Sequence, residues 1–491
     1  MTPRLPQPAD SRVGAEPAAG DAGRRPAYAV RAVLRPPDDP DWNGARLQVQ
    51  IAGLSLIERH LLGLRAAGVR DVEIAMPAHD PAVEKAVRGV EVPGVRLQLA
   101  IDGHLTGRDA IVIEQRADTL VDPRLVFEVV RWAVANAASA ECVDRFAANY
   151  PPAAKSPFTG AAARAGDIRE VDPAAETGLF AAGLSVTHPA AERPPARLHA
   201  GRRYWHRIAG ATDASQATTK VFHATMKPTD GIYARTNRRV SIPISRILAR
   251  TAVTPNQVTL VAFACSAVAG WLFAQGGYAT MAAGSLVGWF ASMLDGVDGE
   301  LARAKFRATR FGAWLEMVCD YLYYVLVFAG MGVGVYRRTP DPLWILMGAG
   351  AVVGVVLSFV AVARWKQRHF PHAGGGDSAL AFQRTVEAGA SNPVYAFLRR
   401  CAFLATRATL PYYIAIFALL DLIDLLIVII FVGTHLTWML VLYASRLPVQ
   451  AVALTGAVDA PVEPPRPAHA GEAAPSQTGR RSMAPLRGEP S

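Results

Sequence analysis

The sequence predicts a multidomain protein in which an amino-terminal α/β domain is followed by an all-α membrane domain of six transmembrane helices. Three observations lead to this fold class. Hydrophobic residues make up 51% of the 491 residues and are concentrated after residue 255, which separates a soluble part from a membrane part. Strand-like and helix-like patterns alternate between residues 27 and 138. Several carboxylates lie in or beside the later apolar segments, where ionisable groups are costly and usually functional.

The elements of the amino-terminal domain follow from short apolar runs and amphipathic stretches. Short apolar runs predict strands, and stretches with helical periodicity predict helices. The predicted strands are residues 29–34, 69–75 and 110–114, and the predicted helices are residues 55–67, 81–87 and 123–137. This alternation is typical of an α/β domain, which we place at residues 27–138.

The order of these elements resembles that of the sugar-nucleotide nucleotidyltransferases. Leu54–Arg59 followed by Ala66–Val69 is similar to the family's second helix and strand, and Asp118–Pro123 is similar to its metal-aspartate segment. The resemblance implies a Gly-rich phosphate loop after the first strand, but Leu34–Pro40 contains no glycine. Without such a loop, backbone amides are not free to hold a triphosphate. We therefore expect a degenerate, catalytically silent domain; retained binding of a nucleotide or sugar phosphate is the alternative.

The segments outside the predicted domains have compositions typical of linkers or disorder. Residues 1–26 mix Pro, Ala, Gly and charged residues without an apolar core, so we expect disorder and no secretory signal. Residues 139–226 are rich in Ala, Pro, Gly and Arg, which predicts a linker with some helix around Gly201–Ile208. Residues 448–491 are predicted to form a disordered tail.

The membrane domain is predicted at residues 227–447. Ser241–Leu248 combines isoleucines with an arginine, which predicts an amphipathic helix at the membrane surface. Apolar segments of about 20 residues match the thickness of a bilayer. The six predicted spans are residues 257–275, 279–299, 311–335, 342–363, 403–420 and 425–446.

Charged loops determine the predicted orientation in the membrane. Arginines and lysines precede the first span, separate the second from the third and follow the fourth, and positive loops stay cytoplasmic. Both termini are therefore predicted to be cytoplasmic, in the inner membrane if the source is bacterial. Arg337 and Arg338 are exceptions on the predicted outer side.

The net charge of +10 is explained by these flanking arginines, so we expect anionic lipid head groups as partners and no nucleic acid. Four cysteines have neither paired nor metal-type spacing and are predicted to be reduced thiols; they are Cys142, Cys265, Cys319 and Cys401.

Carboxylates at helical spacing predict a cation site. Asp295 and Asp298 are three residues apart. Glu316 and Asp320 are four apart, so each pair shares one face of a helix. Two such faces turned toward each other would form a group that is stable at neutral pH only with bound cations. Ligation by oxygen suits magnesium, calcium or manganese. The alternative is pairing with nearby basic residues, namely Arg303, Lys305 and Arg307.

This spacing resembles the signature of the CDP-alcohol phosphotransferases, Asp-x2-Asp-Gly-x2-Ala-Arg-x8-Gly-x3-Asp-x3-Asp. Seven of its eight fixed positions match, at Asp295, Asp298, Gly299, Ala302, Arg303, Gly312 and Asp320. Glu316 stands where the third aspartate of the signature is expected. Residues 237–239 and 254–259 also resemble the approach to the family's first span, so the resemblance covers residues 227–447. An α/β domain fused ahead of it is similar to the inositol-phosphate cytidylyltransferase and phosphotransferase fusions.

The resemblance implies a membrane-integral transferase that moves a phosphoryl-alcohol group from a CDP-alcohol donor to an acceptor hydroxyl and releases CMP. It implies that Mg²⁺ or Mn²⁺ is held by Asp295, Asp298, Glu316 and Asp320. Asp320 would also be the general base. The nucleotide would be bound by Gly299, Ala302, Arg303 and Gly312. A substrate phosphate would be held by Arg238 or Arg239, which fit a positive-inside membrane anchor equally well.

The acceptor and two other function classes stay open. The fused architecture favours a polyol phosphate such as inositol phosphate, whereas a lipid alcohol is the commoner acceptor of the family. A homodimer is the expected assembly. Glu316 and the missing phosphate loop would also fit a catalytically inactive membrane scaffold or binding protein. A cation transporter likewise places carboxylates in membrane spans, but it would release no CMP.

Overall fold

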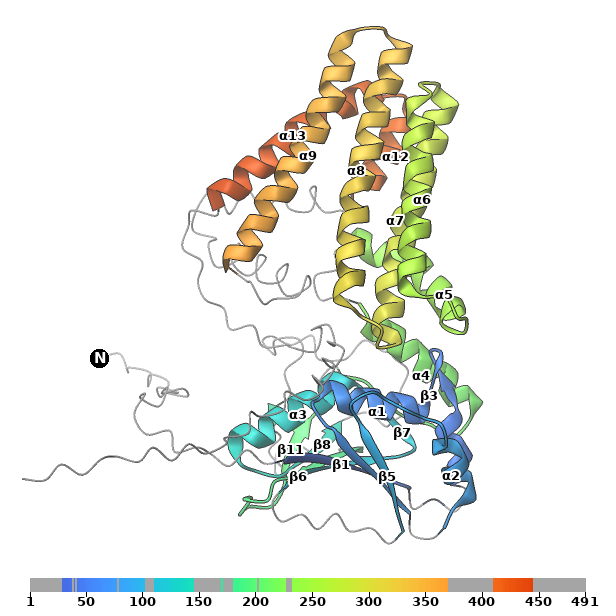
Figure 1. Cartoon of the computed structure of the whole chain (residues 1–491), viewed down its shortest axis with the longest axis vertical. Helices are drawn as coiled ribbons and strands as arrows, with labels where there is room; N and C mark the ends of the chain where they lie inside the picture. Colours follow the sequence, from blue (N-terminus) through green and yellow to red (C-terminus); the bar gives the residue numbers. More distant parts are fainter. Residues whose placement is uncertain are drawn as a thin grey trace, which may run out of the picture.

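The computed structural model describes residues 29–37, 39, 42–76, 79–101, 110–144, 169–170, 180–200, 203–226, 232–369 and 409–444. Figure 1 shows a part built around a β-sheet at the bottom and a set of long helices above it. The segments predicted to be disordered, residues 1–26 and 448–491, lie outside the described residues. Cys142, Cys265 and Cys319 are free thiols, as predicted, and Cys401 lies outside the described residues.

Eight strands form the main sheet. Their bounds are β1 Ala29–Arg35, β4 Asp71–Met76, β5 Arg96–Ile101, β6 Ala110–Arg116, β8 Ala140–Asp144, β9 Arg169–Glu170, β10 Phe180–Thr187 and β11 Ala196–His199. The spatial order is β5-β4-β1-β6-β10-β8-β11-β9. The first four strands of this order are parallel, with Val33 opposite both Glu73 and Glu114. β10 then runs antiparallel to β6 and β8, so the sheet is mixed.

Two small two-stranded sheets accompany the main sheet. They pair β2 Gln50–Ile51 with β3 Leu54–Ser55, and β7 Thr119–Val121 with β12 Trp205–Arg207.

Three helices of the sheet domain begin at polar caps. They are α1 Leu56–Ala66, α2 Pro81–Val87 and α3 Pro123–Asn136. Ser55 Oγ accepts a hydrogen bond from the Glu58 amide, and the Glu58 carboxylate accepts one from the Ser55 amide at 2.7 Å. This capping box satisfies amides that the first turn leaves unpaired. Asp80 and Asp122 cap the other two helices, each followed by proline, which fits the first helical position. The predicted strands and helices of residues 27–138 are confirmed; the strands β2, β3, β5 and β7 were not predicted.

Residues 139–226 are not a linker, contrary to the prediction. β8, β10 and β11 extend the main sheet, and α4 Ala211–Ala224 follows them. The helix predicted around Gly201–Ile208 is wrong too, because Trp205–Arg207 forms the strand β12. Short strands whose partners are distant in the sequence show little periodicity of their own, so composition alone suggested a linker.

The helical part follows the sheet domain. Its described helices are α5 Ile232–Ala249, α6 Pro255–Ala274, α7 Tyr278–Ala304, α8 Arg310–Arg338, α9 Pro342–His369, α12 Leu410–Leu419 and α13 Ile423–Ala444. The predicted surface helix at Ser241–Leu248 lies within α5. Helix α6 packs against both α7 and α8, and α9 packs against α8 and α13 (Figure 1). Thr254 caps α6 through a capping box with Gln257.

Within the described residues, four helices are long and apolar enough to cross a membrane: Pro255–Ala274, Arg310–Arg338, Pro342–Trp365 and Ile423–Tyr443. They correspond to the first, third, fourth and sixth predicted spans. The second predicted span falls in α7, a 27-residue helix that also carries the acidic motif. The fifth overlaps α12, which has 10 residues, and its residues 403–408 lie outside the described ones. Six spans are therefore not confirmed for the described part of the chain.

The two arginines on the predicted outer side have specific partners at the end of the helical part far from the sheet. Arg338 donates two hydrogen bonds of 2.8 Å to Asp421, which lies between α12 and α13. Arg337 donates to the carbonyl oxygen of Ala274 at the end of α6, at 2.8 Å. An ion-paired charge and a helix-capping charge explain why these arginines depart from the positive-inside pattern.

A shared apolar cluster joins the sheet domain to the helical part. It contains Ile51 and Leu56 of the sheet domain together with Val297, Leu301 and Ala304 of α7. None of these five residues is more than 1% exposed. Helices α4 and α5 contribute further apolar side chains to the same cluster. The sheet domain is therefore packed directly against the end of the helix that carries the acidic motif.

Candidate metal centre

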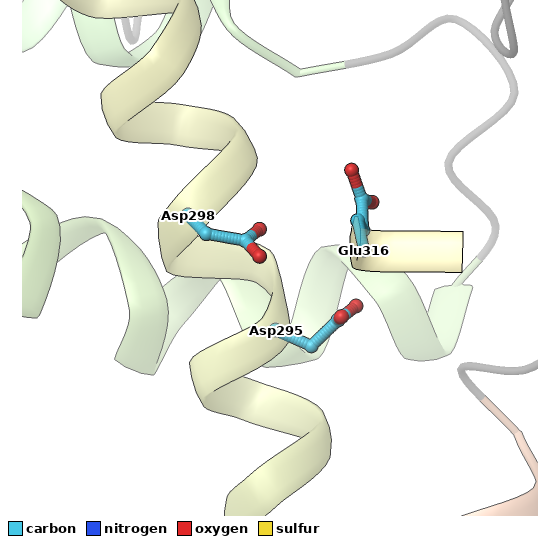
Figure 2. Close-up of side chains that lie close together, drawn as sticks. All are labelled: Asp295, Asp298 and Glu316. Atoms are coloured by element: carbon cyan, nitrogen blue, oxygen red, sulfur yellow. The ribbon is translucent and has the colours of Figure 1, made fainter. Parts of the chain in front are cut away.

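Three carboxylates converge near the end of α7 that contacts the sheet domain. Asp295 and Asp298 extend from α7 and Glu316 extends from α8 toward a common space (Figure 2). One ligand oxygen from each lies within 4.8 Å of the others. The three-residue spacing places both aspartates on one face of α7, as predicted.

Asp298 is held in place by two donors. Its side chain is buried among α6 and α7, with 3% exposure. Oδ2 accepts a hydrogen bond of 2.5 Å from Thr259 Oγ1 on α6, and Oδ1 accepts one of 2.5 Å from the Gly299 amide. These bonds fix the direction of the carboxylate. The sequence assigned no role to Thr259, although it lies in the stretch 254–259 that resembles the family.

The donor set fits a hard divalent cation. All three groups are carboxylates, and three like charges this close repel one another unless a cation neutralises them. Oxygen ligands of this kind suit Mg²⁺, Mn²⁺ or Ca²⁺. Glu316 reaches the same space as the two aspartates. Its departure from the family motif therefore does not remove the third ligand.

Asp320 lies one helical turn after Glu316 on α8 and borders an adjoining space. It is not among the three carboxylates whose oxygens lie within 4.8 Å of one another. It lines a narrow pocket together with Asp295. Hydroxyl groups from α6, α7 and α8 line the same pocket, namely those of Thr259, Ser266, Ser292 and Tyr323. The predicted group of four carboxylates is therefore a group of three with Asp320 beside it, facing a small pocket that apolar residues such as Phe263 and Pro411 also line.

Arg303 lies one helical turn after Gly299 on α7, and its guanidinium group passes over the glycine. A Cβ atom at Gly299 would lie 3.1 Å from Arg303 Nη1, so the glycine leaves room for the guanidinium group. Arg303 Nε donates to the carbonyl oxygen of Thr225, just after α4, at 3.0 Å. The guanidinium group is thereby fixed beside Gly299, and its fork of donors matches phosphate oxygens.

Gly312 lies where the start of α8 approaches the start of α6. A Cβ atom there would lie 3.0 Å from Asn256 Oδ1. The Gly312 amide donates to Thr309 Oγ1, the cap of α8, at 2.9 Å. Ala302 is half-buried on α7. Small residues at these positions allow close approach of the helices, whereas their role in nucleotide binding stays a prediction, as it does for Gly299 and Arg303.

Glu300 is a fully buried charge in the motif to which the sequence assigned no role. It accepts hydrogen bonds from Ser241 Oγ at 2.6 Å and Ser245 Oγ at 2.5 Å. Arg238 Nη1 donates to it at 2.6 Å. All three donors come from α5, so this carboxylate ties α5 to α7. The sequence does contain a signal for this contact. Ser241 and Ser245 are four residues apart on the predicted amphipathic helix, so they share the face that could meet a buried acid.

The two arginines predicted to hold a substrate phosphate differ in their surroundings. Arg238 is largely buried, and besides Glu300 it donates to the carbonyl oxygen of Gly296 at 3.2 Å. Arg239 is exposed. The predicted phosphate contact remains a prediction for both residues, and Arg239 is the more accessible one.

In the segment that resembles the metal-aspartate segment of the nucleotidyltransferases, the Asp118 carboxylate is bonded to two arginines. Asp118 is fully buried, and its carboxylate accepts hydrogen bonds from Arg116 at 3.0 Å and Arg207 at 2.9 Å. Burial acts to raise the pKa of Asp118, but the hydrogen bonds from Arg116 and Thr119 outweigh it, so the pKa lies below its ordinary value. Arg207 also pairs with Asp39, at 2.9 Å.

Asp39 lies in the segment where the Gly-rich phosphate loop is expected. It places a negative charge where a triphosphate would need positive charge and free amides. Arg207 thus bonds to both Asp39 and Asp118, and the degenerate nucleotidyltransferase-like character of the domain stays a prediction.

Residues 252–420 match the family model described as CDP-alcohol phosphatidyltransferase. This segment contains every fixed position of the acidic motif, from Asp295 to Asp320. The match confirms the family resemblance predicted from the motif.

Two proteins are similar in sequence to parts of this chain. The bifunctional IPC transferase and DIPP synthase of Aquifex aeolicus (strain VF5) is 38% identical over 119 residues, which cover 24% of this chain and 27% of that protein. The phosphatidylinositol phosphate synthase of Mycobacterium bovis (strain BCG / Pasteur 1173P2) is 40% identical over 95 residues, which cover 19% of this chain and 42% of that protein. The chain therefore spans about a quarter to two fifths of the length of these relatives.

Among solved structures, the phosphatidylinositol phosphate synthase of Mycobacterium tuberculosis with CDP-DAG bound is 23% identical. The alignment covers 42% of this chain and 94% of that chain, with a TM-score of 0.30.

Proposed function

We propose that the protein is a membrane-integral, divalent-metal-dependent CDP-alcohol phosphotransferase. It would move a phosphoryl-alcohol group from a CDP-alcohol donor to an acceptor hydroxyl and release CMP. The observation that carries the proposal is the convergence of Asp295, Asp298 and Glu316 from two helices, within the segment that matches the family.

Asp295, Asp298 and Glu316 would supply the ligands for Mg²⁺ or Mn²⁺, with Thr259 orienting Asp298. When bound, the ion would neutralise charge on the pyrophosphate of the donor. Arg303 would hold a donor phosphate through its planar guanidinium group. Gly299 leaves the space in which that group lies.

Asp320 would act as the general base from the small pocket that it shares with Asp295. The oxygen of the acceptor hydroxyl forms a bond to the phosphorus that carries the donor's alcohol. The bond from this phosphorus to the oxygen of CMP breaks, and CMP leaves with the electron pair. The acceptor's proton passes to the Asp320 carboxylate. A role for Asp320 as a fourth metal ligand also remains part of the proposal.

The first acceptor to test is a polyol phosphate of the inositol phosphate type. The name of one relative, phosphatidylinositol phosphate synthase, supports this choice, and so does the fused α/β domain. A lipid alcohol is the second acceptor to test.

We further propose that α7 and α12 join the four apolar helices in a six-span membrane domain at residues 227–447, which forms a homodimer. The 27-residue length of α7 supports this arrangement. The sheet domain would occupy residues 27–226. Both termini would be cytoplasmic, because the sheet domain lies at the same end of α7 as a basic segment; its residues are Arg303, Lys305, Arg307 and Arg310.

The test measures CMP release by the full-length protein in detergent, with CDP-diacylglycerol or CDP-inositol as donor and a panel of acceptors. Release should require Mg²⁺ or Mn²⁺, and Asp298→Asn should abolish it, because the ion loses one of three carboxylate ligands. Asp424→Asn, at an exposed site in the first turn of α13, is the matched control and should retain activity. Full turnover in excess chelator would contradict the metal requirement. A scaffold or a cation transporter would release no CMP with any donor.

A further inference from the structure

The carboxyl end of α7 is held by an arginine of the sheet domain. Arg59 lies on α1 and is 4% exposed. Its Nη2 donates to the carbonyl oxygen of Ala304, the last residue of α7, at 3.0 Å. The last carbonyl groups of a helix have no partner within the helix and carry partial negative charge. Arg59 is therefore a helix cap that another domain supplies.

The same guanidinium group fixes the β2–β3 hairpin. Arg59 Nε donates to the carbonyl oxygen of Ile51 at 2.6 Å, and Nη2 also donates to that of Ala52 at 3.2 Å. The Ala52 amide in turn donates to Thr218 Oγ1 on α4 at 3.2 Å. One side chain thus joins α1, the hairpin and the end of α7.

Gly53, at the tip of this hairpin, is in direct contact with the helical part. It has a φ of +79°, and a Cβ atom there would lie 1.9 Å from the carbonyl oxygen of Ala249 and 3.2 Å from Lys305 Cε. Lys305 follows α7 and donates to the carbonyl oxygen of Thr251 at 3.0 Å. The hairpin is therefore seated against the end of α5 and against the residue that follows α7.

Helix α7 connects this contact to the metal centre. Val297, Leu301 and Ala304 recur at helical spacing and are buried in the cluster shared with the sheet domain. Asp295 and Asp298 lie on an adjoining face of the same hydrogen-bonded helix. A shift of the carboxyl end of α7 would displace both aspartates relative to Glu316, which α8 carries.

We propose that Arg59 and the β2–β3 hairpin are positioning elements of the metal centre, so that the sheet domain holds α7 in the geometry that binds the ion. The inference rests on the proposed function in one respect, the role of Asp295, Asp298 and Glu316 as ligands of a divalent cation. It gives the degenerate domain a task that needs no nucleotide.

The first test measures Mn²⁺ affinity of the full-length protein in detergent by electron paramagnetic resonance, together with amide hydrogen exchange at residues 295–305. Arg59→Ala should weaken Mn²⁺ binding about tenfold, the scale of a lost hydrogen bond to a charged group, and should speed exchange at the end of α7. Arg59→Lys keeps the charge and should recover part of the affinity. Arg65→Ala is the matched control, because Arg65 lies on the same helix and bonds to Pro93 inside the sheet domain.

The second test uses two glycines that share a left-handed backbone conformation. Gly53→Ala adds a clash with Ala249, whereas Gly89 has a φ of +83° and nothing within 4 Å of the position that a Cβ atom would take. Both substitutions place alanine in a left-handed conformation and cost similar strain. Gly53→Ala should weaken Mn²⁺ binding at least as much as Arg59→Ala, and Gly89→Ala should bind Mn²⁺ as the wild type does.

Wild-type Mn²⁺ affinity in both Arg59→Ala and Gly53→Ala would overturn the proposal. Equal losses in Gly89→Ala or Arg65→Ala would overturn it as well, because the effect would then be a general loss of domain stability. The proposed function fails separately: a wild-type protein that binds Mn²⁺ but releases no CMP would disprove the transferase, while the positioning effect would remain measurable.

Discussion

At position 316 a glutamate stands where the family motif has an aspartate, and the structure shows how the site accommodates it. An additional methylene lengthens a side chain by about 1.5 Å. One Glu316 oxygen nevertheless lies within 4.8 Å of oxygens of Asp295 and Asp298. The carboxylate approaches the two aspartates from the facing helix α8 (Figure 2), so either acid can reach the shared space.

Glu316→Asp should therefore retain Mn²⁺ binding and CMP release. The shorter side chain changes the size of the site, so the preference between Mg²⁺ and Mn²⁺ should shift, because Mg²⁺ demands the tighter geometry. Turnover measured across both metals checks this expectation. Glu316→Gln is the control that keeps the length and removes the charge; it should bind either metal more weakly. An inactive Glu316→Asp would show that the longer acid is required.

Asp320→Asn should separate catalysis from metal binding. Asp320 lies outside the group of three carboxylates, so Mn²⁺ affinity should stay close to that of the wild type. Turnover should fall by about a hundredfold or more, the usual scale of general-base catalysis. Affinity and turnover are measured on the same detergent preparation. Normal turnover in this variant would show that another group accepts the proton.

Glu300→Gln should destabilise the helical part without removing a metal ligand. It leaves Arg238 largely buried without its anionic partner, which costs about 3 kcal/mol or more for a buried pair. Thermal unfolding in detergent should show the loss, and Arg238→Gln should show a similar one. If the pair of Glu300 and Arg238 is responsible, the double variant should lose less stability than the two single variants lose together. Additive losses would indicate that Glu300 and Arg238 contribute independently.

At the level of elements, α7 combines three roles on different faces. It carries two carboxylates of the metal centre, it is tied to α5 through Glu300, and it packs against the sheet domain through Val297 and Leu301. Polar and charged residues serve the first two roles, so α7 is not among the helices that apolar length alone identifies as spans. Its identity as a helix was nevertheless predictable, because the motif spacing follows the helical repeat.

The elements around β1 and β6 predict that the sheet domain makes no CDP-alcohol from CTP. Asp118 is bonded to Arg116 and Arg207, and Asp39 lies where phosphates would bind. The full-length protein should therefore release no pyrophosphate from CTP with inositol phosphate or sugar phosphates. A coupled pyrophosphate assay, calibrated with added pyrophosphate, measures this. Pyrophosphate release with any of these substrates would show that the domain is catalytically active.

For the whole molecule, sequence patterns predicted the elements that depend on residues close to one another in the sequence. The strands β1, β4 and β6 and the helices α1 to α3 follow from periodicity and caps such as Ser55. The strands β8, β10 and β11 depend on partners far away in the sequence, so composition misassigned them to a linker. The candidate site shows the same division. Helical spacing predicted the convergence of the carboxylates, whereas the contact of Arg59 with Ala304 depends on packing between domains.

The apolar cluster shared by the two parts has a consequence for how such a chain evolves. Deletion of the sheet domain would expose Val297 and Leu301 and would leave the end of α7 without Arg59. A gene that lost this half would need several compensating polar substitutions on α7 at once. Selection for folding alone would therefore retain the sheet domain. Substitutions should accumulate fastest around Asp39 and Asp118 and slowest along the hairpin that touches the helical part.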